Sequence, residues 1–210
     1  QYSEVLPDPS VSIASDLNSY ASSQFEQFLY TVLGKRFPAG QYILWEGYQA
    51  QGGFPDNCID YFINGTSSGE KIISQASTLV HECGHFLDLA TGGWGDSGYH
   101  FTEDLLFVCA DGSTPDNGGG KTFSRSLINT DEFSDLHPPC TSYSGNDCDT
   151  YAYIYLNGNP NDSQFDSGDQ GFNMLHEETL QYVHSLATGY TFNDFYSGSV
   201  SERDGILTFL

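Results

Sequence analysis

The sequence predicts an α+β fold, a single domain in which several helices accompany a small mixed sheet. Three observations predict it. The chain has 210 residues, enough for one domain with a sizeable core. Some segments carry apolar residues at helical spacing, whereas other short runs of aliphatic and aromatic residues are typical of strands. No internal repeat divides the sequence, so we expect one domain over residues 1–210.

The first part of the chain is predicted to form a helix followed by two short strands. Residues 1–11 hold two prolines and are expected to be an extended lead-in. Apolar residues at helical spacing predict a helix from Ser12 to Leu33, which Gly34 ends. Short strands are predicted at 42–45 and 59–63, on either side of a loop rich in Gly and Pro.

The rest of the chain is predicted to be mainly helices joined by long loops. A helix over about 70–90 is opened by Ser68-Gly69-Glu70 and ended by Gly92-Gly93. A shorter helix is predicted at 101–110. The remaining expectations are an irregular insertion rich in Gly, Asp, Ser and Pro at 111–148, a Tyr-dense helix or strand at 149–156, a loop at 157–171, a helix at 172–187 and a strand-like end at 206–210.

The charge of the chain excludes two classes of partner. There are 28 acidic and 6 basic residues, for a formal net charge of -22. A chain of this charge is repelled by nucleic-acid phosphates and by anionic membrane surfaces, so we expect neither as a partner. No apolar run approaches the ~20 residues that span a bilayer. We expect a monomer, and the first residue, Gln1, is expected of a processed chain.

Cysteine usage indicates an extracellular protein. Two N-x-Ser/Thr sequons, at Asn64 and Asn161, and the scarcity of lysine agree with secretion. An odd number of cysteines leaves at least one without a partner in the chain. We expect Cys140 and Cys148 to pair across their loop, and Cys83 to be the leftover thiol. The five cysteines are Cys58, Cys83, Cys109, Cys140 and Cys148.

The residues His81-Glu82-Cys83-Gly84-His85 form an HExxH motif inside the helix predicted at 70–90. Histidines four apart project from one face of a helix and can bind one zinc ion. Glu82 points about 100° round the helix, where it can reach a water molecule on the metal. An apolar stripe is predicted to pack this helix into the domain. The stripe comprises Ile72, Ala76, Leu79, Cys83 and Leu87.

A catalytic zinc needs a third protein ligand, and the turn after the helix offers one. The chain there reads Trp94-Gly-Asp96-Ser-Gly-Tyr99, and its glycines allow Asp96 to return to the metal. Tyr99 can then place its hydroxyl near a developing oxyanion. Asp88, on the helix itself, is a poor ligand, because a third group along a straight helix cannot close a tetrahedron. It is a fair acceptor behind the ligands.

Other acidic residues compete with Asp96 for the third position. Glu177 and Glu178 lie on the helix predicted at 172–187, where gluzincins take a glutamate from a second helix. Glu103 and Asp104 are a weaker option, since they are also suited to the first turn of the helix predicted at 101–110. On the 172–187 helix, His176 and His184 are expected to be partly buried polar residues.

The motif and the turn that follows it resemble the aspzincin metallopeptidases, the deuterolysin family. In this family HExxH is followed by a glycine turn and an Asp-x-x-Tyr element, matched here by Asp96-Ser-Gly-Tyr99. Asp149-Thr-Tyr-Ala is similar to a second family segment. The resemblance covers about residues 70–100 and 146–156. It implies a zincin-like domain with one zinc ion on His81, His85 and Asp96, Glu82 as general base, Tyr99 as oxyanion donor and Asp149 as support behind the ligands.

These observations predict a secreted zinc endopeptidase that hydrolyses a protein or peptide substrate. By analogy with zincins, the strand predicted at 59–63 is expected to hold the extended substrate. Three alternatives stay open: a gluzincin-type peptidase with Glu177 or Glu178 as third ligand, a non-catalytic zinc-stabilised binding protein, and a toxin protease with one narrow target.

Overall fold

The computed structural model describes residues 6–50, 56–92, 97–109, 172–195 and 206. In this part the chain is α+β, as predicted, with helices beside a two-stranded sheet. The sheet predicted to be mixed is antiparallel in the described residues. The predictions for 111–171 lie outside them, as do those for 1–5 and 207–210. None of the described helices is long and apolar enough to cross a bilayer.

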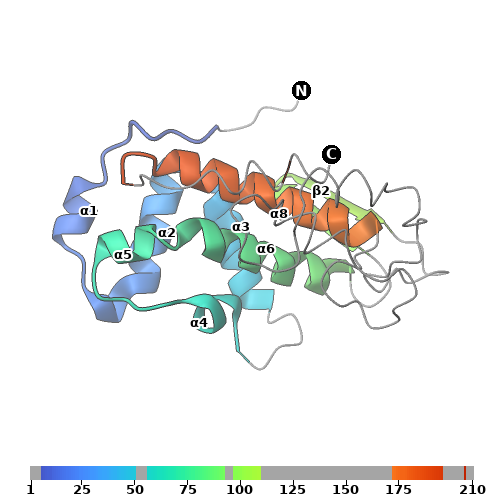
Figure 1. The fold of residues 1–210 in the computed structure, drawn as a ribbon, viewed down its shortest axis with the longest axis horizontal. Helices are drawn as coiled ribbons and strands as arrows, with labels where there is room; N and C mark the ends of the chain where they lie inside the picture. The colour runs from blue at the N-terminus through green and yellow to red at the C-terminus, as the bar shows by residue number, and fades with distance from the viewer. Residues whose placement is uncertain (1–5, 51–55, 93–96, 110–171, 196–205, 207–210) are drawn as a thin grey trace, which may run out of the picture.

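Helix α6, Ala76–Gly92, is the element around which the described structure is arranged. Figure 1 shows α6 and α8 running side by side along the long axis of the molecule. The residues of the predicted apolar stripe are buried, four of them on α6 and Ile72 on the preceding helix, and Gly92 ends α6 as predicted. The elements packed against α6 are α3 (Pro38–Ala50), α4 (Cys58–Phe62), β1 (Ser97–Thr102) and α8 (Phe172–Thr191).

The N-terminal part agrees with its prediction in type but is divided into shorter elements. The helix predicted from Ser12 to Leu33 is three pieces, α1 (Ala14–Asn18), η1 (Ser22–Gln24) and α2 (Phe25–Arg36). Gly34, which was predicted to end the helix, lies inside α2. The helix predicted at 70–90 is two helices: its first residues form a short helix, α5 (Gly69–Ile73), and the residues from Ala76 belong to α6. The Ser68 side chain caps α5 by accepting a hydrogen bond from the Lys71 amide, so the predicted start signal is confirmed.

The strand predicted at 42–45 is wrong, because this segment belongs to α3. The buried residues of α3 are Gly40, Ile43, Leu44 and Gly47, which follow the i, i+3, i+4, i+7 spacing of a helix face. Two of the four are glycines, so a count of apolar side chains misses this period. Gly47 is required by packing: a side chain there would overlap the backbone of Cys83 in α6.

The strand predicted at 59–63 is also wrong, and with it the strand expected to hold substrate. The segment forms α4, whose first turn is capped by Asn57: its side chain accepts a hydrogen bond from the Asp60 amide. Cys58, the first residue of α4, forms a disulfide with Cys83 of α6. Cys83 is therefore not the leftover thiol. The bridge predicted between Cys140 and Cys148 lies outside the described residues.

The helix predicted at 101–110 is replaced by a hairpin of β1 and β2 (Leu105–Cys109). Thr102 pairs with Leu105, so Glu103 and Asp104 form the two-residue turn of the hairpin, and both are exposed. The two acids were interpreted as the first turn of a helix. The aromatic and β-branched residues on either side decide for strands.

Candidate metal centre

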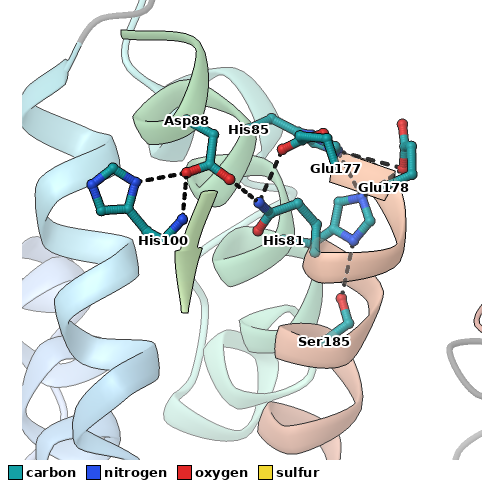
Figure 2. Close-up of polar contacts among 8 residues, drawn as sticks. His81, His85, Asp88, His100, Glu177, Glu178 and Ser185 are labelled. Carbon is teal, nitrogen blue, oxygen red and sulfur yellow. Dashed lines mark hydrogen bonds and ion pairs between the residues drawn. The ribbon is translucent and has the colours of Figure 1, made fainter. Parts of the chain in front are cut away.

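Helices α6 and α8 pack antiparallel, and this brings the HExxH motif against the start of α8. Ser185 of α8 donates a hydrogen bond to the Ser77 carbonyl in the first turn of α6. Glu177, two turns earlier in α8, contacts His85, two turns later in α6. Figure 2 shows His81 and His85 facing Glu177 and Glu178 across this helix pair. The centre therefore depends on segments 92 residues apart in the sequence.

Three side-chain atoms converge here in a group that can hold a metal ion: the Nε2 atoms of His81 and His85 and a carboxylate oxygen of Glu178. The two nitrogens are 2.9 Å apart, and they lie 3.5 and 3.6 Å from Glu178 Oε2. Zinc bonds of ~2.0–2.2 Å at tetrahedral angles separate ligand atoms by about 3.3–3.6 Å. The two distances to Glu178 fit this range, whereas the 2.9 Å between the two nitrogens corresponds to a narrower angle at the metal, about 90°. One cation can contact all three atoms at ordinary bond lengths if that angle is narrow.

Hydrogen bonds at the other ring nitrogens direct both Nε2 lone pairs toward the centre. Ser185 Oγ lies 3.2 Å from His81 Nδ1, and with its one proton directed to the Ser77 carbonyl it accepts a hydrogen bond from Nδ1. His85 Nδ1 likewise donates to the Glu177 carboxylate, at 2.5 Å. With Nδ1 as donor in two neutral rings, two lone pairs and a carboxylate oxygen face one another. Such a group is completed by a cation, either a metal ion or a proton.

The charged side chains around the centre also favour a bound cation. Glu177 and Glu178 are buried and Glu82 is half-buried. Glu177 lies against His85, and Glu178 lies against both histidines. Burial of carboxylates is costly unless a positive charge lies close by, and a metal ion between these side chains would supply one.

In the metal-free protein a proton takes the place of the cation. Burial acts to lower the pKa of His85, but the charges of Glu177 and Glu178 outweigh it and raise that pKa well above its ordinary value. Burial acts to raise the pKa of Glu178, yet the neighbouring histidines lower it to about 2. Burial raises the pKa of Glu82, with His81 and His85 opposing the shift. A raised pKa suits a carboxylate that must take up a proton.

A network of buried polar side chains lies behind the ligands. Asp88 accepts hydrogen bonds from the His100 amide (2.9 Å) and from His100 Nδ1 (2.7 Å), and it also accepts from Gln181 Nε2 (2.8 Å). Burial raises the pKa of Asp88 to about 6, against the hydrogen bonds from His100. Burial lowers the pKa of His184 to about 4, so its ring is neutral and Nε2 can donate to the His100 carbonyl. Asp88 is therefore a buried acceptor for His100 and Gln181, and Gln181 links it to Glu177.

The structure brings together some of the predicted site residues and leaves others outside its description. His81, His85 and Glu178 form the centre. Asp96 and Asp149, predicted from the turn and the family resemblance, lie outside the described residues. Tyr99 lies in β1, is 3% exposed, and its ring is 4.9 Å from that of His176. The sequence motifs did not identify Ser185, which contacts His81, or Gln181, which contacts Glu177, because both contacts depend on how α6 and α8 pack. Of the two α8 histidines, His176 is exposed and His184 is buried.

Comparison of the chain with models of known families, with curated proteins and with solved structures finds no significant match in any of the three. The functional argument therefore rests on the geometry and chemistry of the centre itself.

Proposed function

We propose that the chain is a secreted zinc-dependent endopeptidase whose metal ligands are His81, His85 and Glu178. The observation that supports this most is the triangle of two Nε2 atoms and one carboxylate oxygen, with edges of 2.9, 3.5 and 3.6 Å. Two imidazoles and one carboxylate are a catalytic zinc donor set, whereas magnesium and calcium prefer oxygen ligands alone. One zinc ion per chain is expected.

Glu82 is the residue we assign to proton transfer. It follows His81 directly in α6 and is half-buried; burial raises its pKa, and the charges of His81 and His85 act to lower that pKa. A zinc ion on these ligands would supply Lewis acidity to a water molecule and to the scissile carbonyl. Glu82 takes a proton from the water and gives it to the leaving amine. The oxyanion role of Tyr99 and the supporting role of Asp149 remain proposals carried by the family resemblance.

The extracellular setting and the substrate class are part of the same proposal. The Cys58–Cys83 disulfide ties α4 to the HExxH helix, and disulfides persist in oxidising compartments. With 28 acidic residues, the chain is suited to polypeptide substrates rather than polyanions. Protein or peptide is therefore the substrate we propose.

The test combines metal analysis with two matched variants. Purified protein loaded with zinc should hold about one equivalent per chain, cleave an unfolded protein substrate, and lose this activity with a chelator. Glu178→Gln should weaken zinc binding tenfold or more, whereas Asp96→Ala should leave it nearly unchanged. The reverse result would assign the third position to Asp96. Less than about a tenth of an equivalent of zinc in the wild type would end the metallopeptidase proposal.

Two further outcomes identify the alternatives. Full zinc occupancy with no hydrolysis of any substrate indicates a zinc-stabilised binding protein. Cleavage confined to one or a few sequences in a peptide library indicates a protease with a narrow target.

A further inference from the structure

Two adjacent glutamates, Glu177 and Glu178, reach the centre from the same turn of α8, yet their contacts differ. Glu178 Oε2 lies 3.5 and 3.6 Å from the two Nε2 atoms. Glu177 instead lies behind His85: its Oε2 accepts from Nδ1, the ring nitrogen that faces away from the centre, and its Oε1 accepts from Gln181 at 2.9 Å. Both oxygens of Glu177 are thus used within the protein.

Gln181 holds Glu177 in this position. One amide nitrogen, Gln181 Nε2, donates to Glu177 Oε1 and to Asp88 Oδ2, at 2.9 and 2.8 Å. The two protons of the amide group satisfy both bonds. A flipped amide would turn its oxygen toward two carboxylates, so the orientation is determined by chemistry. Gln181 is 1% exposed, and water does not compete for these bonds.

A glycine inside the HExxH motif provides the space for Gln181. A side chain at Gly84 would overlap the Gln181 amide. Gln181 Oε1 lies against this glycine and has no hydrogen-bond partner within the described structure. A glycine inside a helix costs about 1 kcal/mol relative to alanine. The glycine and the unpaired oxygen both allow Gln181 to hold Glu177 in place, so their cost is explained if the metal centre depends on the position of Glu177.

We infer that Glu177 is the positioning residue of the metal centre: it keeps His85 in the tautomer whose Nε2 is free to bind the cation, and its charge strengthens that bond. The inference rests on the metal site of the proposed function. Carboxylates that accept from a metal-bound histidine typically account for 10–100-fold in metal affinity. The adjacent glutamates therefore divide the work, with Glu178 on the metal and Glu177 behind His85.

The test compares Glu177→Gln with Glu178→Gln, and uses Asp194→Asn at the other end of α8 as the control. Zinc affinity is measured by competition with a chromophoric chelator, and the ligand set by the visible spectrum of the cobalt(II)-substituted protein. We expect Glu177→Gln to weaken zinc 10–100-fold without moving the cobalt bands, and Glu178→Gln to change the bands. The control should match the wild type in both.

The wild-type protein provides a second measurement that does not depend on how a variant folds. In the zinc-loaded protein, long-range proton–nitrogen NMR should find the His85 proton on Nδ1. A proton on Nε2 would overturn the inference. So would zinc affinity within twofold of wild type in folded Glu177→Gln, or cobalt bands that move in Glu177→Gln as in Glu178→Gln. If the wild type binds no zinc, the proposed function itself fails, which is a different result.

Discussion

The two ends of α8 are both joined to the rest of the molecule by buried charge, but only one of them is complete. At the C-terminal end, the Arg36 side chain from α2 is 3% exposed. It donates to both oxygens of Asp194, at 2.7 and 2.8 Å, and to the carbonyls of Val11 and Thr191. The rings of Phe192 and Phe195 lie 5.7 and 5.5 Å from the guanidinium carbon. This charge has all its partners within the chain.

At the N-terminal end, Glu177 and Glu178 face His81 and His85, and when both rings are neutral the three converging atoms are all acceptors. The attachment of one helix to another does not need such an arrangement. Arg36 joins α2 to the end of α8, 155 residues later in the chain, with every nitrogen of its guanidinium group hydrogen-bonded. Burial of charge therefore does not by itself mark a functional site. A better indication is a buried group whose hydrogen bonds direct lone pairs at one another, so that a metal ion or a proton must lie between them.

The largest effect we expect is on the rate of catalysis, and it should appear only for a variant at the metal-centre end of α8. Glu82→Gln should lower the rate of peptide hydrolysis by three or more powers of ten while zinc binding is retained, because Glu82 transfers protons and is not a ligand. Asp194→Asn should hydrolyse the same substrate at the wild-type rate. Steady-state kinetics with zinc analysis on the same samples check both. Loss of zinc from Glu82→Gln would mean that the role is misassigned.

The second effect is on stability and belongs to the other end. Arg36→Met should lower the free energy of unfolding by about 3 kcal/mol, because it leaves the Thr191 and Val11 carbonyls without their donor and removes the pair with Asp194. Zinc affinity should not change. Urea unfolding of the metal-free variant gives the first number and chelator competition the second. A large change in affinity would show that the two ends are coupled.

The third effect uses the metal itself. Zinc at a hundredfold excess over its dissociation constant should stabilise the wild type by about 2.7 kcal/mol, because it binds only the folded centre. The same increment should appear in Asp194→Asn, since distant sites act additively, and should be much smaller in Glu178→Gln. Thermal unfolding with zinc and with chelator measures it. Equal increments in all three proteins would place the stabilising metal elsewhere.

The sequence predicted the chemistry of α6 better than the structure around it. HExxH places two imidazoles on one face by helical geometry alone, so His81 and His85 follow from the pattern. Glu178 was among the predicted alternatives, but its role depends on the antiparallel packing of α6 and α8, which no local pattern contains. The helix at 172–187 was identified, although it continues past Gly189 to Thr191.

The errors in the fold have a common cause. In α3 the buried face includes Gly40 and Gly47, so a count of apolar side chains misses its period. In α4 a single capped turn is too short for a period to show. Cys83 was correctly placed facing the core, but its partner Cys58 arrives on a segment that was taken for a strand. Glycine contacts and short elements depend on tertiary packing, which sequence patterns do not record.

The smallest effect is a pH dependence at the complete end. Hydrogen bonds from Arg36 hold the pKa of Asp194 below its ordinary value of 3.8, against a weaker effect of burial. A lowered folded-state pKa stabilises the protein fully above pH 3.8, and that contribution is lost as the pH falls through the folded-state pKa. The Asp194 side chain is 43% exposed, so solvent screens the pair and the effect is small. Metal-free wild type should therefore be slightly more stable than Asp194→Asn at pH 6, and the two should converge in acid, where both residues are neutral. Urea midpoints at several pH values measure the gap. The carboxylates of the metal centre titrate equally in both proteins, so their effect cancels in the comparison. If the difference in stability between the two proteins did not change with pH, the Arg36 side chain would be held by the two carbonyls and the two rings rather than by the charge of Asp194.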